Sequence, residues 1–359
     1  MFTACNADLP SEEQFINAEP FAGPYRIVTE ASYTDNGDGT VSDNISGLMW
    51  QQDPGEKMDY YDAVNGVEDF ELAGYTDWRV PSIKELYSLI DFDGIDPSGP
   101  DIDSSGLSPF IDDSVFGFEY GDTGSGDRVI DSQWVTSTKY VSTVMGGQEC
   151  FFGVNFADGR IKCYPTQAGK GYFSIYVRGN EGYDENQFED NGDGTVLDRA
   201  TTLTWQQGDS GEGMDYAAAV DYCGGLNLAG YDDWRLPHVK ELQSIVDYSR
   251  SPDTTASAAI DPIFEVSSIT DEGGGKNYPF YWSETAHKNL RGDGNACYIA
   301  FGEALGWMQG PGGTYELQDV HGAGAQRSDP KSGDASAYPY GHGPQGDVIR
   351  INNYVRCVR

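Results

Sequence analysis

A run of carboxylates in the first half of the chain has the composition of a divalent-cation site. The segment DFDGIDPSGPDIDSS (91–105) combines aspartates with prolines and glycines. The aspartates are Asp91, Asp93, Asp96, Asp101 and Asp103. Calcium takes roughly six to eight oxygen ligands, which carboxylates and carbonyls in flexible loops supply. The segment is therefore either a calcium site or a solvated acidic loop. Asp329, Asp334 and Asp347 are a looser second set in the other half of the chain.

A long segment rich in Gly, Pro and Asp, at about 308–348, carries side chains suited to ligand contact. The candidate ligand-binding residues in and beside it are Trp307, His321, Arg327, Lys331, His342 and Arg350. The tryptophan could stack on a ligand or pack in the core, and the two interpretations weigh equally. The three basic residues could form a local basic island for an anionic ligand. The two histidines are explained more simply as exposed loop residues than as metal ligands.

The chain shows none of the sequence motifs that mark common catalytic sites. The G-x-S-x-G, H-E-x-x-H, phosphate-loop and dinucleotide-binding patterns are absent from the sequence. Histidines and carboxylates do not by themselves define an active site. We therefore expect a binding protein rather than an enzyme.

Two of the cysteines behave as a pair when the halves of the chain are compared. Cys223 lies where the first half has Val67. Cys357 lies in a closing segment whose counterpart, FSIYVRGN (173–180), has no cysteine. Both cysteines are present in one half and both are absent in the other, which predicts a disulfide between them.

A second, local disulfide is expected between Cys150 and Cys163, which flank the hairpin sequence VNFADGR. Disulfides persist in oxidising compartments, so we expect a secreted or surface-attached protein. Thr3-Ala4-Cys5 resembles the end of a lipoprotein cleavage site. Lipidation of Cys5 is thus an alternative to an ordinary cysteine there. No stretch approaches the roughly 18–20 apolar residues that a membrane-spanning helix requires.

The elements that position these residues occur twice. DNGDGTVSDNISGLMWQQ (35–52) returns as DNGDGTVLDRATTLTWQQ (190–207). LAGYTDWRVPSIKELYSLID (72–91) returns as LAGYDDWRLPHVKELQSIVD (228–247). This period is far longer than the roughly 20–50 residues of solenoid or propeller repeats, and it suits a duplicated globular domain. We assign residues 1–30 to a leader or packing arm, 31–180 to copy one and 181–359 to copy two.

Each copy is predicted to open with a hairpin. Asn-Gly-Asp-Gly occurs at 36–39 and at 191–194, and these residue types tolerate the positive φ that tight turns need. An EF-hand calcium loop needs a different spacing of acidic residues, so the turn is the better interpretation there. Further strands are expected at 133–138, 151–161 and 299–307.

Two helices are predicted in each copy. Asp59 and Asp215 are N-cap residues for the first helix of copies one and two. Ser82 and Glu85 have the S-x-x-E spacing of a capping box before the second helix. Copy two has His238 in place of the capping serine.

The charge of the chain limits its partners. It contains 58 acidic and 22 basic residues, a formal net charge of −36. Such a surface repels nucleic acid and anionic lipid, so nucleic-acid binding is excluded as a function. The 46 glycines and 23 tyrosines favour short strands, many turns and few helices.

The motif order resembles a known family. DNGDGTV, GLMWQ, LAGY-x-DWR-x-P-x-x-KEL and the closing NYVRCVR are similar to the C-terminal domain of the Legionella collagen-like adhesin, Lcl. The similarity covers nearly all of both copies. More distantly, WR-[VL]-P before a helix and the closing RCVR resemble the C-type-lectin and formylglycine-generating-enzyme fold. In that fold a disulfide ties the first helix to the last strand, as Cys223 and Cys357 would do. Copy one lacks both cysteines, so its closure is expected to depend on packing.

The resemblance implies an α+β protein of tandem, duplicated C-type-lectin-like domains. Each would hold two helices against small twisted antiparallel sheets with long irregular loops. The expected function is extracellular adhesion, in which the loops of copy two bind a carbohydrate or matrix-type polymer, with calcium as a candidate cofactor. The alternative is a structural subunit of a cell-surface assembly that contacts itself or other surface proteins without binding glycan. An oxidase of the formylglycine-generating type is disfavoured, because the cysteines look structural. The acidic surface favours a neutral glycan, or an anionic one bridged by calcium or held by the basic island.

Overall fold

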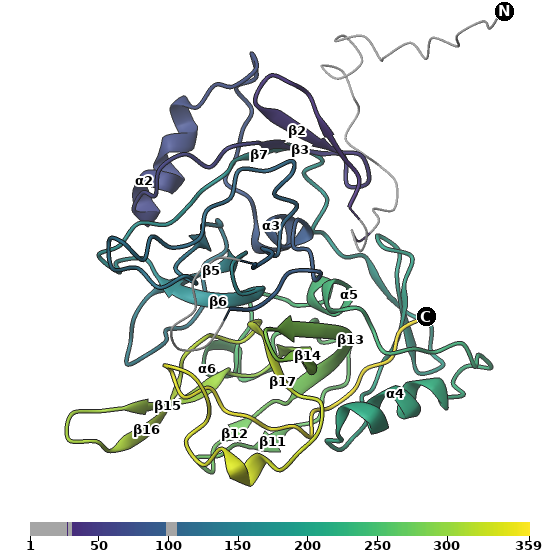
Figure 1. Cartoon of the computed structure of the whole chain (residues 1–359). Helices are drawn as coiled ribbons and strands as arrows, with labels where there is room; N and C mark the ends of the chain where they lie inside the picture. Colours follow the sequence, from purple (N-terminus) through teal and green to yellow (C-terminus); the bar gives the residue numbers. More distant parts are fainter. Residues whose placement is uncertain (1–26, 28–30, 98–105) are drawn as a thin grey trace, which may run out of the picture.

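The computed structural model describes residue 27, residues 31–97 and residues 106–359. Within them, short helices and small antiparallel sheets form an α+β architecture (Figure 1). The helices are α2 (Tyr60–Asn65), α3 (Ile83–Ser88), α4 (Tyr216–Gly224), α5 (Val239–Ser244) and α6 (Pro252–Thr255), with 3-10 turns η1 (Gly66–Asp69) and η2 (Ala335–Ala337). None of these helices is long and apolar enough to cross a bilayer. Cys5, Asp101 and Asp103 lie outside the described residues.

Each copy opens with a small antiparallel sheet. In copy one it contains β1 (Tyr33–Asp35), β2 (Thr40–Asp43), β3 (Leu48–Gln51) and β7 (Val177–Gly179). In copy two it contains β8 (Phe188–Asp190), β9 (Thr195–Asp198) and β10 (Thr204–Gln206). The predicted turns are confirmed: Asn36 N donates to Thr40 O and Asn191 N to Thr195 O, both at 3.1 Å.

The predicted helix starts are also confirmed. The Asp59 and Asp215 side chains accept from backbone N–H groups in the first turns of α2 and α4. Ser82 and Glu85 complete a capping box at α3. At α5 the His238 Nδ1 atom accepts from Lys240 N at 3.2 Å, so the imidazole replaces the serine hydroxyl as the cap.

A six-stranded sheet joins the two copies. Its order is β13-β14-β17-β6-β5-β4, so three strands of copy two lie beside three of copy one. They are β13 (Phe280–Asn289), β14 (Gly292–Ala300), β17 (Gln326–Pro330), β6 (Arg160–Pro165), β5 (Cys150–Asn155) and β4 (Gln133–Trp134). The seam is the antiparallel pair β17–β6, in which Gln326 pairs with Ile161. His321 O also accepts from Cys163 N at 3.1 Å across the copies.

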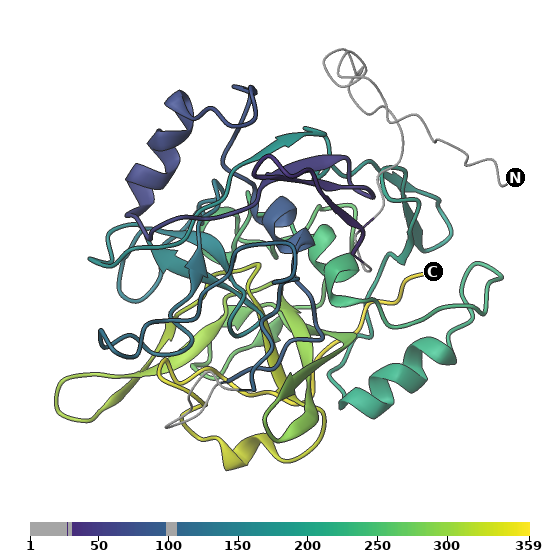
Figure 2. The ribbon, with the colours of Figure 1, turned by 45° about the horizontal axis from the view of Figure 1, so that its top comes forward.

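Three strand predictions were wrong in their extent. The segment 133–138 is regular only over β4. The segment 151–161 is interrupted between β5 and β6 by a turn in which Gly159 has φ +66°. The segment 299–307 is interrupted between β14 and β15 (Leu305–Gln309). Beyond it, β15 pairs with β16 (Tyr315–Asp319) in a hairpin that projects from the body (Figures 1 and 2), and β11 (Ile269–Thr270) pairs with β12 (Lys276–Asn277).

The helices of the two copies meet in a shared core. One hydrophobic cluster contains Leu86 of α3 and Leu242 of α5, together with side chains from the shared sheet. Lys240 Nζ of α5 donates to Ser88 O of α3 at 2.8 Å. Because the apolar faces of both copies are buried against each other, the two copies pack together rather than being joined only by a flexible linker.

Both predicted disulfides are confirmed. Cys150–Cys163 links β5 to β6, and Cys223–Cys357 links the end of α4 to the closing segment. Cys297 is a buried free thiol. Copy one has no disulfide at the matching place; there Tyr176 Oη donates to Ala63 O of α2 at 2.8 Å.

Candidate functional site

A groove of about 450 Å³ in copy two is lined by aromatic and polar side chains from separate segments. This volume lies within the range of roughly 300–1,000 Å³ typical of small-molecule sites. Its main side chains are Glu272, Phe280, Trp307, Tyr338, Arg350, Asn353 and Tyr354. The fold thus brings together Trp307 and Arg350, which the sequence separates by more than forty residues.

The single Arg–Glu pair of the groove neutralises itself. Arg350 donates to Glu272 Oε1 at 2.9 Å from Nε and to Oε2 at 3.1 Å from Nη2. Its guanidinium lies 3.9 Å from the centre of the Phe280 ring. This two-point pairing fixes the planar group and leaves the groove without net charge from these residues.

A buried carboxylate supports the segment that carries Arg350 and Asn353. Asp329 Oδ2 accepts from the backbone N–H groups of Arg350 and Ile351, each at 3.0 Å, and from Asn353 Nδ2 at 3.1 Å. Burial raises the pKa of Asp329 to about 6 despite these hydrogen bonds. Arg350 Nη1 and Asn353 Oδ1 have no hydrogen-bond partner among the described residues. Both atoms are buried, so they lie beneath the surface of the groove.

The aromatic rim of the groove continues onto the projecting hairpin. The Trp307 ring lies edge-on to Tyr340 at 6.2 Å, and Tyr340 stacks on Tyr315 at 4.0 Å. Tyr340 is 52% exposed and Tyr315 is 38% exposed. Exposed rings of this size are candidates for ligand or partner contact.

Each of the three basic residues considered for a local basic island lies beside a different carboxylate. Arg327 pairs with Asp347, Lys331 lies 3.9 Å from Asp293, and Arg350 pairs with Glu272. Each cation thus has its own carboxylate nearby, so its charge is largely neutralised. The two histidines differ in exposure, since His342 is exposed whereas His321 is only 3% exposed, although both contact Asp347.

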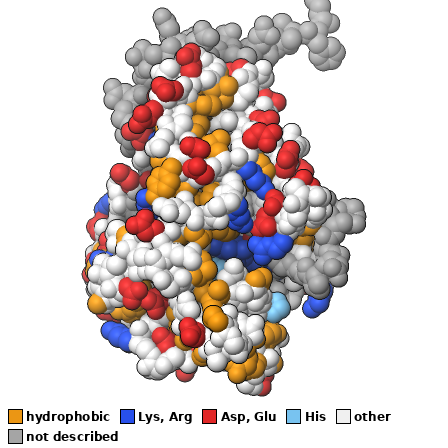
Figure 3. Space-filling view, turned by 90° about the vertical axis from the view of Figure 1, so that its left-hand side faces the viewer, with side chains coloured by type: hydrophobic (Ala, Val, Ile, Leu, Met, Phe, Trp, Pro, Cys, Tyr) orange, Lys and Arg blue, Asp and Glu red, His pale blue; other side chains and the backbone are white. Residues whose placement is uncertain are grey.

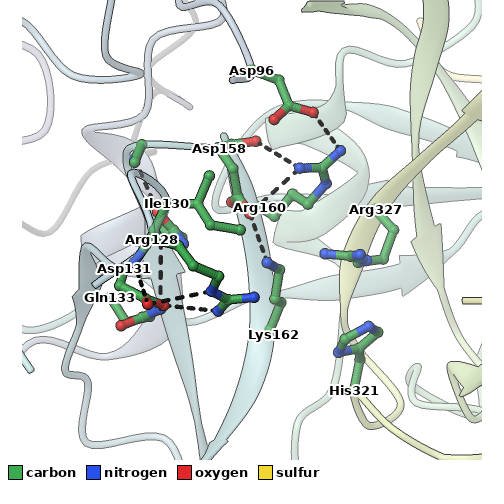
Figure 4. Close-up of polar contacts among 12 residues, drawn as sticks. Asp96, Arg128, Ile130, Asp131, Gln133, Asp158, Arg160, Lys162, His321 and Arg327 are labelled. Carbon is green, nitrogen blue, oxygen red and sulfur yellow. Dashed lines mark hydrogen bonds and ion pairs between the residues drawn. The ribbon is translucent and has the colours of Figure 1, made fainter. Parts of the chain in front are cut away.

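His321 and Arg327 belong instead to a polar cluster at the seam between the copies (Figure 4). We call this group the seam cluster; it comprises Asp96, Asp158, Arg160, Lys162, His321, Arg327 and Asp347. Asp158 Oδ2 accepts from Lys162 Nζ at 2.6 Å, and Asp96 Oδ2 accepts from Arg160 at 2.6 Å. Asp347 accepts from His321 Nε2 at 2.8 Å and also pairs with Arg327.

Burial dominates the protonation of the seam cluster. It lowers the pKa of Lys162 to about 8, and Arg327 and Arg160 lower it further, while Asp158 opposes the shift. Burial lowers the pKa of His321 to about 4, so its imidazole is neutral near pH 7 and donates from Nε2. Burial disfavours ionised Asp347, but Arg327 and His321 still hold its pKa below its usual value.

The acidic insert does not converge within the described residues. Asp93 pairs with Lys288 at 2.7 Å, and Asp96 turns inward to Arg160. Asp91 accepts from the backbone N–H of Asp93 at 2.9 Å. No group of three or more His, Cys, Asp or Glu residues suited to a metal ion occurs in the part of the chain that the structure describes. Calcium binding at the insert stays a prediction.

Comparison with known proteins places the chain in a family. The model of the Lcl C-terminal domain matches residues 39–178 and again residues 194–316, which together make up most of the chain. The chain belongs to the Lcl C-terminal domain family. No curated protein and no solved structure matched it. In this tandem member of the family, the two matched regions fall in copy one and copy two, as the sequence motifs predicted.

Lcl C-terminal domain membership and the two disulfides are consistent with an extracellular, adhesin-like protein.

The sequence did not predict Glu272, Tyr338 and Asn353 as residues of the groove. Glu272 lies 78 residues from its partner Arg350, so no local spacing could reveal the pair. The aromatic enrichment of the segment around Tyr338 and Tyr340 was the available signal.

Proposed function

We propose that this protein is an extracellular binding protein whose groove in copy two takes a neutral carbohydrate or matrix polymer. The observation that carries the proposal is the composition of the groove. Trp307, Tyr338 and Tyr354 supply rings, while the only Arg–Glu pair is internally neutralised. Aromatic faces pack against the apolar faces of sugar rings, and no unpaired charge favours an ionic ligand.

Two polar atoms of lining residues lie buried behind the groove. Arg350 Nη1 is a donor and Asn353 Oδ1 an acceptor, and neither has a partner among the described residues. A hydroxyl group donates and accepts at once, so a sugar hydroxyl would complement both atoms once the Arg350 and Asn353 side chains turn them toward the groove. Buried polar groups are normally satisfied, and a bound ligand is one way to satisfy these.

The scaffold supports a lectin-like interpretation. The Cys223–Cys357 bridge ties the first helix of copy two to its closing segment, as the C-type-lectin-like resemblance requires. We propose binding without catalysis, and calcium as an accessory ion rather than a part of the groove.

Glycan-array binding of the purified chain tests the proposal. We expect binding to neutral glycans in calcium that persists in chelator, since the lining of the groove contains no carboxylate other than the paired Glu272. Loss of the signal in chelator would move the site to the acidic insert. A blank array in both buffers would contradict the proposal.

A blank array would favour the second candidate, a subunit of a surface assembly. The projecting β15–β16 hairpin with its exposed Tyr315–Tyr340 stack is the feature that would make such contacts (Figure 2). Concentration-dependent self-association, measured by light scattering and lost in Tyr315→Ala, would support it.

A further inference from the structure

Three cations from two different copies face one another at the seam. Arg160 and Lys162 are two residues apart on β6, so they project from the same side of the strand. Gln326 of β17 pairs with Ile161, so the next residue, Arg327, lies near the end of β6 that carries Arg160. Like charges close together on neighbouring strands destabilise a sheet unless negative charge lies between them. Basic side chains gather in the middle of one face of this otherwise acidic protein (Figure 3).

The seam carboxylates balance the charge but do not use all the donors. Asp96 and Asp158 engage Arg160 and Lys162, and Asp347 engages Arg327. Arg327 Nε and Nη1 are buried, and neither has an acceptor among the described residues. The Lys162 ammonium can donate three hydrogen bonds. Among the described residues it donates to Asp158 Oδ2.

Arg327 cannot relieve this deficit by losing its proton, because a guanidinium stays charged at all physiological pH values. Its side chain is 11% exposed and that of Lys162 is 14% exposed, so both side chains reach the surface at their edges, while Arg327 Nε and Nη1 are buried. Figure 4 shows Arg327 directed toward the strand that carries Arg160 and Lys162. An acceptor with several oxygen atoms would satisfy these donors.

One acceptor beside these donors restricts the class of ligand. Asp158 is fully buried, and its Oδ1 atom has no hydrogen-bond partner among the described residues. A fully deprotonated anion would be repelled by this carboxylate oxygen. An oxyanion that keeps one O–H would donate to it while accepting from Lys162 and Arg327.

We propose that the seam between the copies binds a phosphate group, either inorganic hydrogen phosphate or a phosphate monoester, with Lys162 and Arg327 as donors and Asp158 as the acceptor. The second ionisation of a phosphate monoester has a pKa near 6, so a fraction retains its proton near neutral pH. Inorganic phosphate keeps one proton there as well, whereas sulfate has none. The site is distinct from the groove and would tie β6 of copy one to β17 of copy two.

Isothermal titration of the full chain with inorganic phosphate, sulfate and acetate, at one ionic strength and about pH 7, tests the proposal. We expect phosphate to bind at least about tenfold more tightly than sulfate or acetate, because neither of those anions has both the charge and the O–H. This comparison needs no variant, so it is independent of any folding defect. Equal binding of phosphate and sulfate, or no phosphate binding, would overturn the proposal.

Two variants then locate the site. Lys162→Met should weaken phosphate binding about tenfold or more, since it removes a charge-assisted donor and keeps the apolar stem. Lys288→Met is the matched control, because Lys288 forms a similar pair with Asp93 at 2.7 Å on the surface.

Circular dichroism checks that both variants are folded, and ³¹P line broadening on the wild-type chain reports phosphate binding directly. Equal loss in both variants would show general charge screening and would contradict a site at the seam. Glycan-array binding should be unchanged in Lys162→Met, which separates this site from the proposed function of the groove.

Discussion

Tyr176 of copy one occupies the position that Cys357 holds in copy two. Each residue precedes a valine that pairs with the arginine of the DWR motif, Val177 with Arg79 and Val358 with Arg235. Cys357 closes its copy through the disulfide to Cys223, whereas Tyr176 closes its copy through a hydrogen bond to Ala63 O. The two copies thus fasten the first helix to the closing segment by different chemistry.

Removing the long-range disulfide should destabilise the chain strongly. Cys223→Ala with Cys357→Ala should lower the free energy of unfolding by about 2–5 kcal/mol, measured by urea denaturation. The bridge spans 134 residues of sequence, against 13 for Cys150–Cys163. Because loop-closure entropy grows with loop length, Cys150→Ala with Cys163→Ala should cost less. An equal or greater loss from the short loop would contradict this account.

The tyrosine that replaces the disulfide should contribute a smaller amount. Tyr176→Phe removes the hydroxyl that donates to Ala63 O and should cost about 1 kcal/mol, since the buried carbonyl loses its partner. Tyr61→Phe is the control, because Tyr61 is 39% exposed. Indistinguishable unfolding curves for wild type and Tyr176→Phe would show that copy one closes by packing alone.

Ligand binding should depend on the aromatic side of the groove. Trp307→Ala should weaken the strongest glycan-array ligand about two- to tenfold, because a stacked aromatic ring contributes about 0.5–1.5 kcal/mol. Tyr61→Ala removes an exposed ring from copy one and should leave affinity unchanged. If both variants bind like the wild type in surface plasmon resonance, the groove is not the site.

Stability should fall as the pH rises through the range in which Asp319 ionises. Asp319 accepts from Tyr140 Oη of copy one at 2.9 Å and from Gly322 N at 2.8 Å, with Asp253 and Glu303 also near it. Burial raises the pKa of Asp319 to about 7 from 3.8, and burial together with Asp319 and Asp253 raises that of Glu303 to about 8. The folded state therefore binds more protons than the unfolded state between about pH 4 and 7, so the free energy of unfolding decreases across this window.

The test compares urea unfolding of wild type and Asp319→Asn at pH 5 and pH 8. The wild type should lose about 2 kcal/mol more than the variant over this interval. Asp293→Asn changes a side chain that is 78% exposed and should follow the wild type. A variant with the same pH dependence as the wild type would exclude Asp319 as the titrating group.

The two copies should unfold together. The β6–β17 seam and the shared core mean that loss of one copy exposes apolar surface of the other. Hydrogen-exchange mass spectrometry should give β5 and β14 the same maximal protection, because each exchanges only on global opening. Protection of β14 that outlasts that of β5 would show that copy two is stable alone.

The sequence by itself determined the local elements and the duplication. The Asn-Gly-Asp-Gly turns, the Asp59 and Asp215 caps and the Ser82–Glu85 capping box depend on residues within a few positions of each other, so spacing was sufficient to predict them. The cysteine pair could be predicted as well, since the second copy served as a control for the first.

Only the tertiary structure decided how the copies meet and which side chains share a site. Arg327 was a candidate for a local basic island in copy two, whereas the β17–β6 pairing places it at the seam beside Asp347. Glu272 and Arg350 meet across 78 residues, and Trp307 joins them in one groove. Such contacts follow from strand pairing between distant segments, which is set by the burial of both copies in one core and leaves no periodic signal in the sequence.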